Sequence, residues 1–267
     1  MSDLPITSEA ADARYRAEEK RFSVCTLVTD WPQYEAMLAT FAKGGFRAPD
    51  TEFLHIDNRA SNAYDGFSGL NLFLNTARGR YVILCHQDVR LLDDGIAALE
   101  ARIADVEQRA PNWAVLGNAG GVAPGRVFVR ITDPHYPDLR RGTFPARATA
   151  LDENFLVVRR SANLALSGDL GGFHLYATDL CTVADILGYS SWVIDFHLMH
   201  LSPGNVDDRF HAIRRKLLAK YRRAFRPRWV VTPCAHMFLT ASRWLSLALN
   251  TGWGRKMARR WERLRTR

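Results

Sequence analysis

The sequence is poor in cysteine, and its few cysteines form no recognisable metal-binding or disulfide pattern. No pair has the CxxC or Cys/His spacing of a zinc site, so we expect reduced thiols. A buried free cysteine then behaves as a small hydrophobic side chain. The first twenty residues carry charges of both signs and no apolar segment typical of a signal peptide. We therefore expect a cytoplasmic protein that is not exported.

Long apolar runs and nucleotide-binding glycine motifs are also lacking. The stretch from Met237 to Leu249 is interrupted by Arg243 and is shorter than the roughly 20 residues that a membrane-spanning helix needs. The glycines between Gly117 and Gly125 are followed by a strand-like segment, whereas a Rossmann fingerprint requires a helix there. The chain is nevertheless 47% hydrophobic over 267 residues, which is enough for a substantial core.

Acidic residues are almost missing from the C-terminal part. Residues 209–267 contain 17 Lys and Arg but one acid, a net charge of +16, whereas residues 1–208 carry a net charge of −8. This asymmetry predicts a tail that meets an anionic surface, either a membrane or a nucleic acid. Trp253, Met257, Trp261 and Leu264 recur at helical spacing among basic residues, which favours peripheral membrane attachment. A solvated helix packed on the body is the alternative, and no module typical of nucleic-acid binding is present.

Strand-like and helix-like segments alternate along the body. Strands are expected at 22–29, 52–57, 81–89 and 114–116, and helices at 33–43, 66–77, 95–109 and 178–187. This order predicts an α/β fold with a mostly parallel central sheet and flanking helices. We expect a leader at residues 1–20, one α/β domain at 21–225 and a basic amphipathic helical tail at 226–267.

The segment YVILCHQDV, from Tyr81 to Val89, is the most informative one. An apolar run typical of a buried strand ends on His86, Gln87 and Asp88. Ligands of parallel sheets bind at the carboxyl ends of the strands, so Asp88 is expected at a site. The alternative for Asp88 is a turn or helix-capping role, and His86 could equally be a structural histidine at the strand end.

Several segments, in this order, resemble family 2 glycosyltransferases of the GT-A fold, and more narrowly the glycosyltransferase-like proteins with a His-Gln-Asp triplet after the third strand. The matching segments are TLVTDW (26–31), HIDNRAS (55–61), LNLFLNTARGRYVILCHQDV (70–89), LDENFLVVRRS (151–161), GGFHLYATDLCTVADILGY (171–189) and HLSPG (200–204). The resemblance implies transfer of a sugar, with inversion, from a nucleotide-diphosphate donor to a hydroxyl acceptor on a glycan or lipid, in cell-envelope or surface glycan synthesis. A non-catalytic nucleotide- or glycan-binding module is the alternative.

The resemblance also implies a donor site with a divalent cation. Mn²⁺ or Mg²⁺ would neutralise the diphosphate, with Asp88 and His200 as its ligands. The expected donor-binding residues are Thr29, Asp57, Asn58, His86 and Asp88. Because His86 stands where the family usually has an acid, metal dependence stays open. A structural role is the alternative for His200, and a simple turn for Asp57 and Asn58.

The same resemblance places the acceptor and the catalytic base further along the chain. The family's base lies in an acidic run at the start of a helix, where this chain has Ala177, so the remaining carboxylate, Asp179, is the candidate base. A helix-start Asp stabilised by the helix dipole is the alternative. Asp152, Glu153 and His174 are the expected acceptor-binding residues. The expected location is the cytoplasm or the inner face of the plasma membrane, with no nucleic-acid partner.

Overall fold

The computed structural model describes residues 20–202, 204, 206–254, 256–257 and 260. The chain divides into two compact units, Met1–Ile213 and Arg214–Arg267, and the boundary falls within helix α6 (Asp208–Ala224). Each unit is described by itself. All four cysteines are free: Cys25, Cys85 and Cys181 are buried, and Cys234 is exposed.

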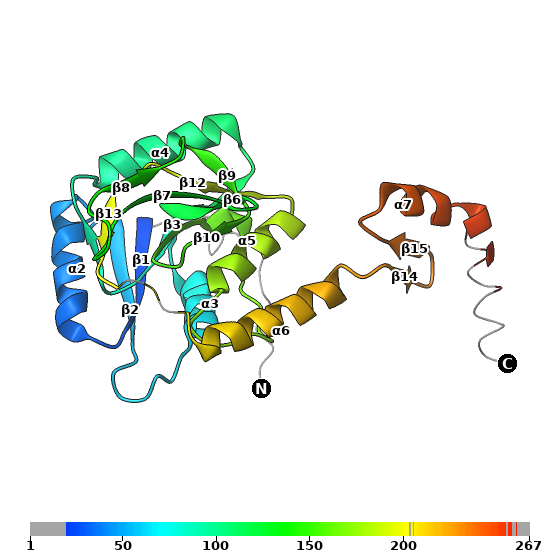
Figure 1. The fold of residues 1–267 in the computed structure, drawn as a ribbon, viewed down its shortest axis with the longest axis horizontal. Helices are drawn as coiled ribbons and strands as arrows, with labels where there is room; N and C mark the ends of the chain where they lie inside the picture. The colour runs from blue at the N-terminus through cyan, green and yellow to red at the C-terminus, as the bar shows by residue number, and fades with distance from the viewer. Residues whose placement is uncertain (1–19, 203, 205, 255, 258–259, 261–267) are drawn as a thin grey trace, which may run out of the picture. The chain divides into compact units, whose positions relative to one another are not determined.

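A seven-stranded sheet forms the centre of the larger unit (Figure 1). Its strands, in spatial order, are β2 (Thr51–Asp57), β1 (Lys20–Val28), β3 (Gly79–Cys85), β11 (Phe155–Arg159), β5 (Trp113–Gly117), β12 (Ser190–Val193) and β9 (Ala146–Ala148). Strand β1 pairs in parallel with β2 and β3, and β12 pairs in parallel with β5. Strand β11 runs antiparallel to β3 and β5, and β9 antiparallel to β12.

The predicted α/β class is therefore confirmed, but the prediction of a mostly parallel sheet is wrong. The error arises because β11 inserts between β3 and β5, which the chain order of elements does not reveal. A strand that follows a long irregular segment can pair with its neighbours in either direction. Two neighbouring strands that are joined by a crossover helix instead pair in parallel.

Helices cover both faces of this sheet. Helices α2 (Trp31–Lys43) and α4 (Ile96–Arg109) pack on one face, where their apolar side chains form a single core with alternate residues of β1 and β3. Helices α3 (Gly66–Thr76) and α5 (Tyr176–Ile186) lie on the other side (Figure 1). Helix α2 begins at Trp31, two residues before the predicted start, because Asp30 caps it by accepting a hydrogen bond from the Gln33 amide.

A second sheet carries β4 and β13, the two strands that flank the candidate site. Its strands are β10 (Ala150–Leu151), β6 (Ala119–Ala123), β7 (Arg126–Thr132), β13 (Leu198–His200) and β4 (Val89–Leu91), with β8 (Leu139–Arg141) paired to β7. The predicted strand 81–89 is in fact two strands, because the polar triplet at 86–88 turns the chain out of β3 and into β4. Strand β13 pairs antiparallel with β4, with His200 opposite Val89. This register brings His200 beside Asp88.

The C-terminal unit contains two strands that the prediction of a helical tail did not include. It contains a hairpin, β14 (Arg228–Val231) and β15 (His236–Leu239), followed by helix α7 (Arg243–Leu249). Trp261 and Leu264, which belong to the predicted amphipathic pattern, lie outside the described residues. In the part of the chain that the structure describes, none of the helices is both long and apolar enough to span a membrane.

Candidate functional site

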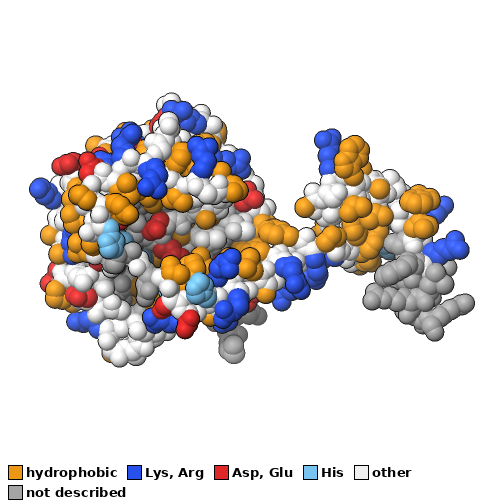
Figure 2. Space-filling model, in the orientation of Figure 1, with side chains coloured by type: hydrophobic (Ala, Val, Ile, Leu, Met, Phe, Trp, Pro, Cys, Tyr) orange, Lys and Arg blue, Asp and Glu red, His pale blue; other side chains and the backbone are white. Residues whose placement is uncertain are grey.

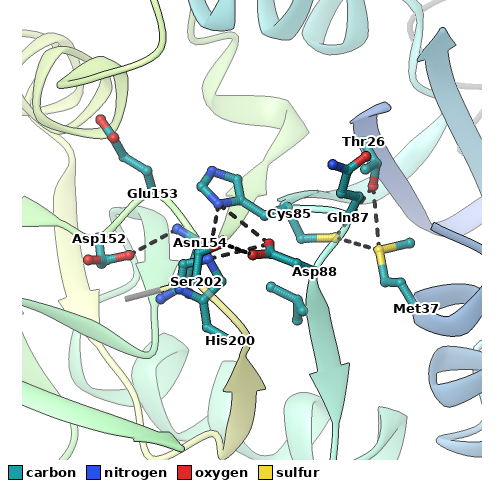
Figure 3. A network of polar contacts seen from close by, with 12 residues as sticks. Thr26, Met37, Cys85, Gln87, Asp88, Asp152, Glu153, Asn154, His200 and Ser202 are labelled. Atoms are coloured by element: carbon teal, nitrogen blue, oxygen red, sulfur yellow. Dashed lines mark hydrogen bonds and ion pairs between the residues drawn. The ribbon is translucent and has the colours of Figure 1, made fainter. Parts of the chain in front are cut away.

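Three side chains with metal-ligating atoms converge at the turn between β3 and β4. Nδ1 of His86 lies 3.3 Å from Nε2 of His200, which in turn lies 3.4 Å from Oδ1 of Asp88. Nδ1 of His86 and Oδ1 of Asp88 are 4.0 Å apart. Figure 3 shows Asp88 and His200 directed toward one another, with Ser202 beside them. The structure thus brings together three of the residues that the sequence indicated.

Asp88 is buried yet ionised. Burial opposes its negative charge, but hydrogen bonds from His200 and Ser202 hold the pKa of Asp88 well below its usual range. The side chain is almost fully covered, at 6% exposure of the residue. A buried carboxylate of this kind needs positive charge or donors around it, and two of its neighbours are imidazoles that a cation would bridge.

The hydrogen bonds around His86 fix which ring nitrogen is free to bind a ligand. The Tyr176 hydroxyl lies 2.7 Å from Nε2 of His86 and donates its single hydrogen to the Glu153 carbonyl, at 3.2 Å. With the Tyr176 hydrogen on the Glu153 carbonyl, Nε2 of His86 is the protonated donor to Tyr176, and Nδ1 carries the lone pair in the neutral ring. Burial lowers the pKa of His86, and the charge of His200 adds to this decrease. The bare Nδ1 is the atom that faces His200 and Asp88.

A strained loop positions Tyr176 for this role. Gly172 has a φ of +110°, and Leu175, directly before α5, adopts the left-handed conformation with a φ of +61°. A leucine seldom adopts this conformation, and such residues cluster at functional sites. The loop is held from the other side by Asp65, whose Oδ2 accepts a hydrogen bond from the Gly172 amide at 2.7 Å.

A pocket of about 340 Å³ opens beside the three residues. One part of the pocket wall is apolar and consists of Leu27, Leu70, Leu84 and Phe173. The polar part consists of Thr29, Gln33, Asn58, Gln87, Asp88, Tyr176, His86 and Ser202. Asp88 and His86 therefore border a space that a small ligand could occupy.

Two of the predicted donor-binding residues, Thr29 and Asn58, line this pocket. Thr29 is held by Gln87, whose side-chain oxygen accepts from the Thr29 and Asp30 amides at 2.8 Å each. The side-chain amide of Asn58 also stabilises the loop from Asn58 to Tyr64, because its Nδ2 donates to the Tyr64 carbonyl at 2.7 Å.

Asp57 lies outside the described lining of the pocket. It pairs with the exposed Arg59 at 2.7 Å, and hydrogen bonds from Arg59 lower the pKa of Asp57 to about 2. Its carboxylate therefore already has a local partner at the surface.

Asp179, the candidate base, is fully buried and bonded to the chain that precedes α5. Its Oδ2 accepts from the Ser167 amide and its Oδ1 from the Ser167 hydroxyl, both at 2.8 Å. The carboxylate thus anchors the 167 loop, and it is not among the described residues that line the pocket. The geometry favours the structural alternative for this residue.

The predicted acceptor-binding residues do not gather at the pocket. His174 lies 3.8 Å from Asp207 and packs its ring against Phe210. Asp152 is exposed and accepts from the Asn154 amide at 3.0 Å. In Figure 3 the side chain of Glu153 points away from Asp88 and His200. The described lining of the pocket contains none of the three.

Glu153 is nonetheless an unusual group. Its Oε1 is buried and has no hydrogen-bond partner among the described residues. Burial raises the pKa of Glu153 to about 8, the adjacent Asp152 adds to the rise, and backbone amides at the start of α5 oppose it. The carboxyl is therefore largely protonated at neutral pH.

The raised pKa of Glu153 predicts a pH-dependent cost to stability. Between pH 4.5, the usual pKa of a glutamate, and about pH 8, the folded chain holds a proton that the unfolded chain has released. The free energy of unfolding must therefore fall as the pH rises through this window. Glu153→Gln should remove this slope, so that the stability of the variant relative to the parent increases by roughly 3 kcal/mol from pH 5 to pH 8. Urea unfolding at several pH values measures the free energy of unfolding of both proteins. Parallel plots of this free energy against pH would contradict the prediction.

Sequence reasoning missed three residues of the site. Tyr176 and Ser202 touch His86 and Asp88 directly, and Gln87 ties the triplet to β1. Ser202 lies in the HLSPG segment, and Tyr176 is the first residue of the helix that carries Asp179, so both are close to residues that the sequence did indicate.

Comparison with known proteins gives no family model that matches the chain. The crystal structure of A197 from STIV has a TM-score of 0.42 at 12% sequence identity, over 70% of this chain and 86% of its own. The crystal structure of a mycobacterial protein has a TM-score of 0.42 at 9% identity, over 90% of each chain. These weak similarities assign neither a fold nor a function.

One relative is much more similar in sequence. A protein of Fuscovulum blasticum named "ATP synthase subunits region ORF 6" is 42% identical over 212 residues, which cover 76% of this chain and 84% of the relative. Its name points away from sugar transfer. The prediction of a glycosyltransferase in polysaccharide biosynthesis is therefore wrong, and with it the assignment of Asp179 as the base of that reaction. The alternative of a nucleotide- or glycan-binding module gains no support from it either.

The expected nucleotide-sugar donor and hydroxyl acceptor stay predictions, since no observation bears on them. The extent and level of the identity do establish kinship, because the match spans most of both chains. The chain belongs to the same protein family as the ATP synthase subunits region ORF 6 protein of Fuscovulum blasticum.

Proposed function

We propose that this protein binds a divalent transition-metal ion through His86, Asp88 and His200. One observation supports the proposal above all: each residue offers a ligand atom, and these atoms lie within 4.8 Å of one another. The hydrogen bond from His86 to Tyr176 leaves Nδ1 of His86 unprotonated and directed at the other two residues. A histidine ligand is commonly oriented in this way, through a hydrogen bond from its second ring nitrogen.

The composition of the ligand set favours some metals over others. The sequence indicated Mn²⁺ or Mg²⁺ held by Asp88 and His200. Adding His86 makes a set of two imidazoles and one carboxylate, which suits Zn²⁺, Fe²⁺, Co²⁺ or Mn²⁺. Mg²⁺ prefers oxygen ligands and retains its water, so it should bind more weakly.

The pocket beside the ligands supports a second part of the proposal, the binding of a small molecule. Three protein ligands leave coordination positions open, and catalytic metal sites keep such positions for water or substrate. Thr29, Asn58 and Gln87 offer hydrogen bonds to the polar end of a ligand, and the leucines that also line the pocket suit an apolar portion. A bound ion would supply Lewis-acid polarisation of an oxygen donor placed there.

Isothermal titration of the chelator-treated protein with Zn²⁺, Co²⁺, Mn²⁺ and Mg²⁺ tests the proposal. We expect one site per chain, with Mg²⁺ the weakest of the four. At a free-metal concentration 100 times the Kd, the free energy of unfolding should rise by about 2.7 kcal/mol. Absence of saturable binding for all four ions would overturn the proposal.

The orienting role of Tyr176 gives a separate prediction. Tyr176→Phe removes the acceptor for Nε2 of His86 while it keeps the ring, so metal affinity should fall by about 10- to 100-fold. Tyr81→Phe is the matched control, because this equally buried tyrosine stacks on Trp113 at the far end of β3. Equal metal affinities of the two variants, measured by titration, would show that Tyr176 does not orient the ligand.

Two finer predictions are retained as proposals. We propose a cytoplasmic location, supported by four free cysteines. We also propose a GT-A-like arrangement of β1, β2 and β3, supported by the parallel pairing of these strands and by the polar triplet after β3. This second proposal concerns architecture alone, because a fold does not determine a reaction.

A further inference from the structure

The C-terminal unit exposes apolar side chains that a folded domain would normally bury. Helix α7 has no buried residue, and Trp244 on it is 81% exposed. Trp253, just beyond the helix, is 67% exposed, and Leu247 is 58% exposed. Figure 2 shows hydrophobic side chains gathered on this unit next to lysines and arginines. Exposed apolar surface of this extent marks an interaction site.

The exposed residues belong to elements that are tied together. Asn250, directly after α7, accepts from the Phe238 amide at 2.8 Å and donates to the Phe238 carbonyl at 3.1 Å. Within β15, Met237 and Leu239 are exposed on one face, whereas Phe238 on the other face packs against Trp229. The hairpin and α7 therefore present their apolar residues from one small structure.

The same unit carries nearly all of the chain's excess positive charge. Residues 214–267 contain 16 Lys and Arg and a single acid, a net charge of +15. Arg243 and Lys256 are exposed close to the two tryptophans in sequence, and Arg214, Arg215, Lys216 and Arg222 are exposed on α6. The unit thus exposes both apolar and cationic side chains.

We propose that this unit docks on the surface of an anionic lipid bilayer. Tryptophan and leucine side chains insert at the boundary between headgroups and acyl chains, and arginine and lysine contact the anionic headgroups. Long basic side chains can place their apolar stems in the lipid while the charge stays at the headgroups. Such an element lies in the membrane surface and needs no spanning helix.

The charge and the apolar residues together favour lipid over other occupants. A second copy of the unit would bring together two net charges of +15, and their repulsion opposes association. Nucleic acid would satisfy the charge and could stack bases on Trp244 and Trp253, but it offers no apolar environment for the exposed Leu239, Leu245 and Leu247. A bilayer with anionic headgroups satisfies both features.

Flotation of the full-length protein with lipid vesicles tests this proposal. Phosphatidylcholine vesicles with about 30% phosphatidylglycerol should bind the protein at least 10-fold more strongly than phosphatidylcholine alone at 0.1 M salt. Binding should weaken at 0.5 M salt, because salt screens the headgroup contribution. Quenching of tryptophan fluorescence by lipids brominated on the acyl chain should report insertion.

Two sets of variants separate the apolar from the charged contribution. The double variant Trp244→Ala/Trp253→Ala keeps the charge and should reduce vesicle binding by about 10-fold or more, with loss of most of the quenching. The double variant Arg243→Glu/Lys256→Glu should reduce binding to anionic vesicles but leave binding to neutral vesicles unchanged. Tyr136→Ala removes an exposed aromatic residue from the larger unit and should leave binding unchanged.

Several results would overturn the proposal. These are equal binding to neutral and anionic vesicles, full binding by the tryptophan double variant, and tight binding to a DNA or RNA duplex without vesicle binding. Concentration-dependent dimerisation that is abolished by the tryptophan double variant, with no vesicle binding, would assign the surface to a second copy instead. Metal titration of the same variants should be unchanged, so this test is independent of the proposed metal site.

Discussion

Replacement of Asp88 by alanine is expected to weaken the binding of Zn²⁺ or Mn²⁺ by more than about 100-fold. An orienting partner alone typically contributes a factor of 10 to 100, and Asp88 is the only carboxylate of the ligand set. Its charge also stabilises any cation held between the two imidazoles. Titration of the chelator-treated variant with each metal measures the loss.

Two further variants make this result interpretable. Asp88→Asn keeps the shape of the side chain that contacts Ser202, so it should fold like the parent protein while it loses metal affinity. Asp93→Ala removes an exposed carboxylate five positions along the chain and should bind metal normally. If Asp88→Asn retains the affinity of the parent, Asp88 is not a ligand.

Asp179→Ala should instead destabilise the fold, by about 3–5 kcal/mol. The fully buried carboxylate accepts two hydrogen bonds from Ser167, and its removal leaves the partly buried amide and hydroxyl of Ser167 without that acceptor. Each unsatisfied group of this kind costs about 1–3 kcal/mol. Chemical unfolding measures the change in the free energy of unfolding.

Asp185→Ala serves as the control on the same helix. The Asp185 side chain is 76% exposed and pairs with Arg147 at 3.7 Å, so its removal should change stability by less than about 0.5 kcal/mol. Under conditions where Asp179→Ala stays folded, its metal affinity should match that of the parent. A loss of less than about 1 kcal/mol in Asp179→Ala would show that the buried contact to Ser167 contributes little.

Local signals in the sequence were sufficient to predict the first half of the sheet. Helix 33–43 was expected and α2 is observed at Trp31–Lys43, because a capping aspartate, a proline and a terminal glycine pair act within the segment itself. The expected strand 22–29 likewise corresponds to β1 at Lys20–Val28. The strand-end position of Asp88 followed from the same local pattern.

Features that depend on distant contacts could not be predicted in this way. The hydrogen bond between His86 and Tyr176 joins residues 90 positions apart, and Asp179 reaches back to Ser167 through a loop with no regular pattern. Short strands such as β13 exist because of the partners beside them, since β-propensity depends strongly on context. The sequence therefore indicated Asp88 and His200 as metal ligands and His86 as a donor-binding residue, but it indicated neither a ligand role for His86 nor its orienting tyrosine.

A crystal of the chelator-treated protein soaked in Mn²⁺ or Zn²⁺ would test the central claim most directly. The measurement is the anomalous difference density at the absorption edge of the metal. We predict one peak between Nδ1 of His86, the Asp88 carboxylate and Nε2 of His200, at about 2.0–2.2 Å from each atom for Zn²⁺. A fully soaked crystal with no peak at these three residues, or with its strongest peak elsewhere, would contradict the proposed metal site.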